Sequence, residues 1–135
     1  MIFITGGNSQ GKRAFAMDAF GLSLSDIADG ASCPIDEAFE ARALNRLHLL
    51  IERMLREGID PMAAALAGAE RNPGIVVICD EVGCGIVPAD PWQREARELT
   101  GRIACALAGR ARRVYRVALG IAVCIKEEKQ CSQCI

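Results

Sequence analysis

The sequence predicts a three-layer α/β fold with a mostly parallel sheet, on three observations. Short apolar segments that are typical of strands alternate along the chain with longer segments of helical periodicity. Residues 75–79 form a continuous run of Ile, Val and Cys, which is typical of a parallel strand covered on both faces. A glycine-rich turn joins the first apolar segment to the first helical one. Strands that alternate with helices in this order favour a parallel sheet with helices on its faces.

The glycine-rich turn carries the clearest chemical signal. It reads Gly6-Gly7-Asn8-Ser9-Gln10-Gly11-Lys12-Arg13 and has the GxxxxGK spacing of a phosphate-binding loop. Gly6 and Gly11 allow backbone angles that turn N–H groups toward an anion, and Lys12 supplies a cation. The turn therefore predicts a loop that wraps nucleotide phosphates, with all eight residues as candidate nucleotide contacts. Arg13 stands where a Ser or Thr hydroxyl normally holds magnesium.

The elements after this turn are predicted in order from caps and periodicity. A helix over residues 12–20 ends at Gly21, and a short apolar stretch around residues 27–28 leads to Asp29. Pro34 and Gly58 are expected to bracket one long helix, with His48 on its buried stripe. Two roles stay open for this single histidine, a satisfied core or interface residue and a catalytic residue.

The second half of the chain continues the alternation. Asp60 caps a helix that runs to about residue 70, the strand at 75–79 follows, and Asp90 caps a third long helix. A glycine-rich loop over residues 82–88 separates that strand from the third helix. Residues 114–119 are predicted to form the final strand, closed by a glycine.

Acidic residues end two of the predicted strands. Asp29 follows one apolar segment, and Asp80 and Glu81 follow another. Ligands of open α/β sheets gather at the carboxyl ends of the strands, where carboxylates beside a phosphate loop can hold Mg²⁺ and the phosphates that it bridges. We therefore predict Asp29, Asp80 and Glu81 as metal ligands. The alternative is that each carboxylate caps a helix or solvates a loop.

Composition limits the remaining possibilities. The chain has 135 residues, 51% of them hydrophobic, and a formal net charge of -1, which predicts one compact domain and neither a nucleic-acid nor a membrane partner. We expect a nucleotide-binding domain over residues 1–126, a flexible C-terminal tail over 127–135 and a cytoplasmic location. Four cysteines are predicted to be small buried side chains: Cys79, Cys84, Cys105 and Cys124. Cys131 and Cys134 form a CxxC in the tail, where an inert pair and a metal or redox site both stay open.

Three segments together resemble a known family. The Thr5-Gly6-Gly7 start of the phosphate loop, the segment Asp80-Glu81-Val82-Gly83-Cys84-Gly85-Ile86-Val87-Pro88 and the later Arg97-Glu98-Leu99-Thr100-Gly101-Arg102 are similar to the bifunctional adenosylcobinamide kinase / adenosylcobinamide-phosphate guanylyltransferase family of cobalamin biosynthesis. The resemblance implies a P-loop-type fold, use of ATP or GTP with Mg²⁺, phosphorylation of a hydroxyl on a corrinoid-like acceptor, and a ring-like homo-oligomer.

The resemblance also assigns roles to individual residues. Residues 6–13 match the phosphate loop, Glu81 matches the glutamate of the family's EVGxGIVP motif, and Asp29 matches an acidic residue that ends an inner strand. Lys12 is expected to stabilise the transferred phosphoryl group, with Asp80 or Glu81 as base or metal partner. The family's nucleotide-accepting histidine belongs to a segment for which this chain has no room between Phe20 and Asp29. We therefore expect a kinase-like phosphotransferase, or alternatively a non-catalytic nucleotide- or corrinoid-binding protein.

Overall fold

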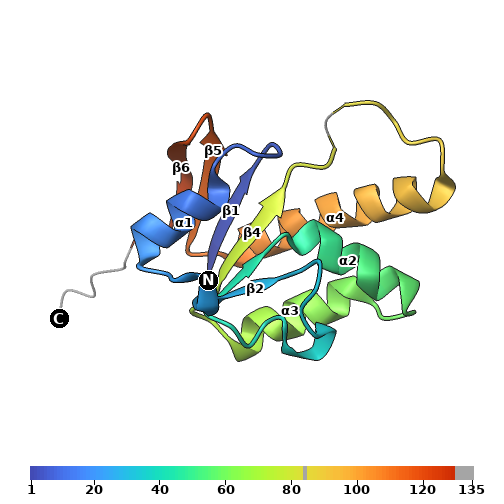
Figure 1. Cartoon of the computed structure of the whole chain (residues 1–135), viewed down its shortest axis with the longest axis horizontal. Coiled ribbons are helices and arrows are strands. Elements are labelled where there is room, and N and C mark those ends of the chain that lie inside the picture. Colours follow the sequence, from blue (N-terminus) through green and yellow to red (C-terminus); the bar gives the residue numbers. More distant parts are fainter. Residues whose placement is uncertain (84, 130–135) are drawn as a thin grey trace.

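A computed structural model describes residues 1–83 and 85–129 of the chain and contains a six-stranded sheet (Figure 1). The strand order is β2-β3-β4-β1-β5-β6. The strands are β1 (Ile2–Gly6), β2 (Ile27–Asp29), β3 (Ala43–Asn45), β4 (Val76–Asp80), β5 (Arg113–Ala118) and β6 (Ile121–Glu127). The first five are parallel to their neighbours, and only β6 runs antiparallel, to β5.

Helices cover both faces of this sheet. They are α1 (Lys12–Phe20), α2 (Leu47–Arg56), α3 (Pro61–Arg71) and α4 (Pro91–Arg110). Helix α1 packs on one face, and α2, α3 and α4 pack on the other (Figure 1). The three-layer α/β fold with a mostly parallel sheet is therefore confirmed, as are the helix ends at Gly21, Asp60 and Asp90.

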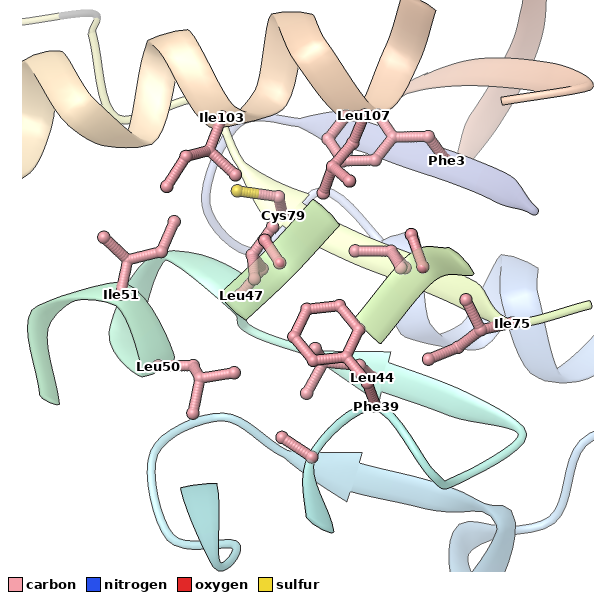
Figure 2. Close-up of a cluster of buried hydrophobic side chains, with 14 of the residues drawn as sticks. Phe3, Phe39, Leu44, Leu47, Leu50, Ile51, Ile75, Cys79, Ile103 and Leu107 are labelled. Atoms are coloured by element: carbon pink, nitrogen blue, oxygen red, sulfur yellow. The ribbon is translucent and has the colours of Figure 1, made fainter. Parts of the chain in front are cut away.

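Strand β4 explains the continuous apolar run at residues 75–79, because its side chains enter the core on both faces of the sheet. Val77 and Cys79 belong to the core beneath α2, α3 and α4, whereas Val76 and Ile78 belong to the core beneath α1. Figure 2 shows the larger core, where side chains from β1, β3, β4, α2 and α4 meet. Because both faces of β4 are buried, every successive residue has to be apolar until the strand emerges at Asp80.

The long helix predicted between Pro34 and Gly58 is wrong. The structure instead has a single 3₁₀ turn (Ile35–Glu37), strand β3 and then α2. Strand β3 pairs with both β2 and β4, so it fills a place that a helix would leave open in the sheet. The chain turns into α2 through Arg46, which has a φ of 58°. Tertiary pairing has therefore overridden the helical propensity of this segment.

The C-terminal part of the described chain also differs from the prediction. The predicted final strand, β5, is followed by a further strand, because Leu119 and Gly120 turn the chain into β6.

Cys79 is buried as predicted, but Cys105 and Cys124 are exposed, so the prediction was wrong for these two. Cys84, Cys131 and Cys134 lie outside the described residues, and the predicted role of the tail stays a prediction. Across 1–83 and 85–129, none of the helices has the length and apolarity needed to cross a bilayer.

Two glycines in helices give a test of this packing. A Cβ atom added at Gly68 in α3 would lie 2.3 Å from Cγ of the Phe39 ring, whereas one added at Gly101 in α4 would meet nothing within 4 Å. We expect Gly68→Ala to lower the free energy of unfolding by about 1–3 kcal/mol through overpacking. The control Gly101→Ala should raise it or leave it unchanged, because alanine favours a helix. Urea denaturation measures both, and equal effects would contradict the proposed contact between α3 and Phe39.

Candidate nucleotide-phosphate site

The site lies at the carboxyl ends of β1 and β4. These strands are neighbours in parallel register, with Gly6 opposite Asp80, and the Glu81 N–H donates to the Gly6 carbonyl at 2.9 Å. From β1 the chain passes to α1 on one face of the sheet, and from β4 it passes to α4 on the other (Figure 1). Adjacent strands whose connections leave toward opposite faces create the crevice where α/β sheets bind ligands.

The backbone of the phosphate loop (residues 6–13) has the conformation that its glycines permit. Gly11 is the N-cap of α1 with a φ of 90°, in the left-handed region that favours glycine. At Gly6 an added Cβ would lie 2.3 Å from the Val117 carbonyl oxygen of β5, so no larger residue fits there. Gln10 attaches the loop to the turn between β5 and β6. Its backbone carbonyl accepts from the Gly120 N–H at 2.9 Å, and its side-chain oxygen accepts from the Leu119 N–H at 2.8 Å.

Lys12 is the buried charge of the site. Its side chain is 6% exposed, and its Nζ lies 2.7 Å from Asp80 Oδ1. The same ammonium group donates to the carbonyl of Gly7. The lysine is thus held across the mouth of the loop, between a carbonyl of the loop itself and the carboxylate that ends β4. An ammonium in this position can stabilise phosphate oxygens that enter the loop.

The structure adds His48 to the site. Its ring lies at the start of α2, with Nδ1 accepting from the Asp80 N–H at 3.4 Å and Nε2 3.6 Å from Asp80 Oδ2. Burial lowers the pKa of His48 below its ordinary value, and the nearby Asp80 carboxylate partly opposes this effect. The helical periodicity of the surrounding apolar residues correctly placed His48 on the inner face of a helix. No sequence signal paired it with Asp80, because their contact depends on β3 lying beside β4.

The other predicted carboxylates are engaged by arginines. Asp29 accepts from Nε of Arg46 at 2.9 Å and also pairs with its Nη2, and this hydrogen bonding lowers the pKa of Asp29. Glu81 accepts from Arg116 at 2.8 and 3.1 Å, which lowers the pKa of Glu81. Each of the three candidate ligands therefore has a different cationic partner, since Asp80 pairs with Lys12.

This arrangement limits how magnesium could bind. Among residues 1–83 and 85–129, no three His, Cys, Asp or Glu side chains form a group that could hold a metal ion. The structure therefore does not bring Asp29, Asp80 and Glu81 to one point. Magnesium commonly uses only one or two carboxylates together with phosphates and water, so Asp80 alone with a bound triphosphate fits its needs.

A cavity of about 410 Å³ brings several predicted residues together. It is lined by residues 8–13 of the phosphate loop and by Asp80, and Asn45 and Arg46 at the end of β3 add to its wall. We call this space the phosphate cavity. The sequence did not single out Asn45 or Arg46, because the predicted long helix concealed the end of β3. Asp29 and Glu81 do not line the cavity, although Asp29 touches it indirectly through Arg46.

The fold and the loop together define a P-loop NTPase-like α/β protein. A family model described as cobinamide kinase / cobinamide phosphate guanyltransferase matches residues 29–125, and the chain belongs to this family. The match includes Asp80 and Glu81 and begins after the phosphate loop.

Two curated relatives agree with this assignment. Both are named bifunctional adenosylcobalamin biosynthesis protein CobU. The one from Salmonella typhimurium is 38% identical over 68 residues, which is 50% of this chain and 38% of that protein. The one from Escherichia coli is 40% identical over 62 residues, which is 45% of this chain and 34% of that protein. The matched part of the chain therefore spans little more than a third of each relative. The family resemblance noted from the sequence is confirmed.

The contact between His48 and Asp80 can be tested by NMR. The chain has one histidine, so its ring proton resonance needs no assignment by mutation. We expect its pKa to lie below 6.5, because burial outweighs the attraction of the Asp80 carboxylate. In Asp80→Asn that attraction is lost and the pKa should fall further, whereas exposed Asp18→Asn should leave it unchanged. A pKa that rises in Asp80→Asn would refute the contact.

Proposed function

We propose that the chain is a nucleotide-dependent phosphotransferase that resembles adenosylcobinamide kinase. It binds ATP or GTP in the phosphate cavity and transfers the terminal phosphoryl group to a hydroxyl of a corrinoid-like small molecule. The observation that carries this proposal is the buried Lys12, held between the Gly7 carbonyl and Asp80 at the end of β4. Membership of a family named for cobinamide kinase supports the choice of acceptor.

The residues of the site take distinct parts in this reaction. Backbone N–H groups of residues 6–13 bind the β- and γ-phosphates, and Lys12 stabilises the charge on the transferred group. The acceptor oxygen forms a bond to the γ-phosphorus, the bond to the leaving nucleoside diphosphate breaks, and Asp80 or Glu81 takes the hydroxyl proton. Magnesium, when bound, offsets the charge on the phosphates, and Asp80 is the carboxylate that would hold it. Arg13 cannot supply a hydroxyl ligand.

Guanylyl transfer is not part of the proposal. A covalent nucleotide intermediate needs a histidine that can reach the α-phosphate. The short passage between Phe20 and Asp29 has no room for the family's histidine segment, and His48 lies against the Asp80 carboxylate on the first turn of α2. A non-catalytic nucleotide- or corrinoid-binding protein is the second candidate, and the exposed Arg13 at the usual magnesium position favours it.

We also propose that the protein is a cytoplasmic homo-oligomer. Strand β6 is an edge strand, and three of its aliphatic side chains are largely exposed: Ile121 (67%), Val123 (57%) and Ile125 (59%). An apolar sheet edge of this kind favours pairing with a second copy. We expect Val123→Asp to lower the molecular mass measured by light scattering. The control Leu24→Asp changes another exposed aliphatic residue (65% exposed) and should leave the mass unchanged. A monomeric wild type would reject the proposal.

Labelled nucleotides separate phosphoryl transfer from guanylyl transfer. With γ-labelled ATP or GTP, Mg²⁺ and adenosylcobinamide, we expect label in the corrinoid. With α-labelled GTP we expect none in the corrinoid and none bound covalently to the protein. Nucleotide binding without transfer would favour the non-catalytic protein, and covalent α-label would show that guanylyl transfer does occur.

Lys12→Ala tests the phosphate loop itself. The change removes a charged hydrogen bond to phosphate, so we expect nucleotide affinity in calorimetry to fall by about 1.5–3 kcal/mol, roughly 10- to 100-fold. Arg102→Ala removes an exposed cation of α4 and serves as the control, with unchanged affinity expected. Melting temperatures of both variants establish that they are folded. Unchanged affinity in folded Lys12→Ala would exclude this lysine from the site.

A further inference from the structure

A second cavity adjoins the phosphate site on the other side of His48. It has a volume of about 320 Å³ and lies between α2, the loop over residues 82–90 and α4. We call it the α2–α4 cavity. Its lining includes His48 and Glu52 from α2, Val82 and Ile86 from the loop, and Trp92 and Thr100 from α4. The His48 ring contacts Asp80, and Asp80 lines the phosphate cavity. One contact therefore links the two cavities.

Hydrogen bonds hold the loop that forms one wall of the α2–α4 cavity. The guanidinium of Arg97 donates to the carbonyl of Val82 and, at 2.7 Å, to the carbonyl of Ile86. Arg94 donates to the carbonyls of Pro88 and Ala89, each at 3.1 Å. Two side chains of α4 thus hold the loop backbone at four carbonyl groups. This wall is attached to the helix at several points, which favours a formed binding site over a gap between elements.

The opposite wall is held in a similar way. The guanidinium of Arg56, on α2, lies over the Trp92 ring of α4 at 4.7 Å from its centroid. This cation–π contact joins the two helices beside the cavity, which both residues line. The hydroxyl of Thr100 donates to the Ala96 carbonyl at 2.7 Å within α4, so its donor is already used. Glu52, Gln93 and His48 are lining side chains whose polar groups can meet a ligand.

The lining selects the chemistry of a ligand. Val82, Ile86 and Trp92 provide apolar contact, and Glu52 can accept a hydrogen bond from a hydroxyl or amide N–H. A volume of about 320 Å³ is at the small end of ligand sites, which suits a flexible polar arm and not a whole macrocycle. Ile86 is 94% exposed at the rim, where it can contact a larger apolar body outside the cavity.

We propose that the α2–α4 cavity is the acceptor site, which receives the hydroxyl-bearing arm of an amide-rich, amphiphilic alcohol while the rest of the molecule lies over Ile86. This inference rests on the proposed phosphotransferase function and assigns a place to its second substrate. The hydroxyl enters past His48 and reaches Asp80 from the side opposite to the nucleotide. Donor and acceptor then meet at the end of β4, as in-line phosphoryl transfer requires.

Ile86→Asp tests the acceptor site without disturbing the core. The probe is cobinamide, whose binding is measured by equilibrium dialysis in the presence of a non-hydrolysable Mg²⁺–ATP analogue. We expect cobinamide affinity to fall at least tenfold, because a charge replaces the apolar rim, while affinity for the analogue alone stays within twofold. Leu24→Asp is the control. Leu24 is 65% exposed and precedes the start of the edge strand β2, whereas the site lies at the carboxyl ends of the central strands β1 and β4.

The outcomes separate this inference from the proposed function. If the wild type fails to bind the nucleotide analogue, the phosphotransferase proposal fails and the acceptor site fails with it. If the analogue binds and Ile86→Asp retains cobinamide as well as Leu24→Asp does, only the acceptor site is refuted. Glu52→Gln provides a second reading, since it should raise KM for the acceptor several-fold and leave KM for the nucleotide unchanged. An equal rise in both constants would refute the assignment of Glu52 to acceptor binding.

Discussion

The ion pair between Lys12 and Asp80 joins the two loops on which the site depends. Lys12 is the first residue of α1, and Asp80 is the last residue of β4. Lys12 Nζ lies 2.7 Å from Asp80 Oδ1, although the two residues are 68 positions apart in the sequence. The lysine is 6% exposed, and a buried charge that loses its partner is strongly destabilising. The sheet register that sets Gly6 beside Asp80 is therefore tied to the position of the lysine that would meet a phosphate.

Charge pairing around this centre explains why the site differs from a simple cluster of carboxylates. Asp29 pairs with Arg46 and Glu81 pairs with Arg116, so each acidic residue at the strand ends is balanced by a cation from another element. A triphosphate that approaches the loop meets Lys12, Arg13 and Arg46 around the phosphate cavity, with Asp80 as its acidic residue. This balance favours an anion over a bare metal ion. Magnesium would then enter together with the phosphates, as it does when it keeps several of its ligands from substrate and water.

Local sequence signals predicted some parts of this structure well and others poorly. Three local patterns predicted their structures correctly: the apolar run at residues 75–79, the helix caps at Asp60 and Asp90, and the GxxxxGK loop. Each pattern lies within a few residues, because strand burial and helix capping depend mainly on neighbouring positions in the sequence. Strand β3 has only three residues and lies in a segment rich in alanine and glutamate, so its identity depends on neighbouring strands. Because β3 was not predicted, the sequence could not place Arg46 beside Asp29 or His48 beside Asp80.

The end of β4 also constrains how a reaction could proceed at this site. The phosphate cavity reaches Asp80 from the side of α1, and the α2–α4 cavity reaches it through His48 from the side of α2 and α4. Because the sheet lies between these sides, two substrates bound there could approach each other only across its carboxyl edge, where Asp80 emerges from the core. A single carboxylate at that point would face both the transferred group and the attacking hydroxyl.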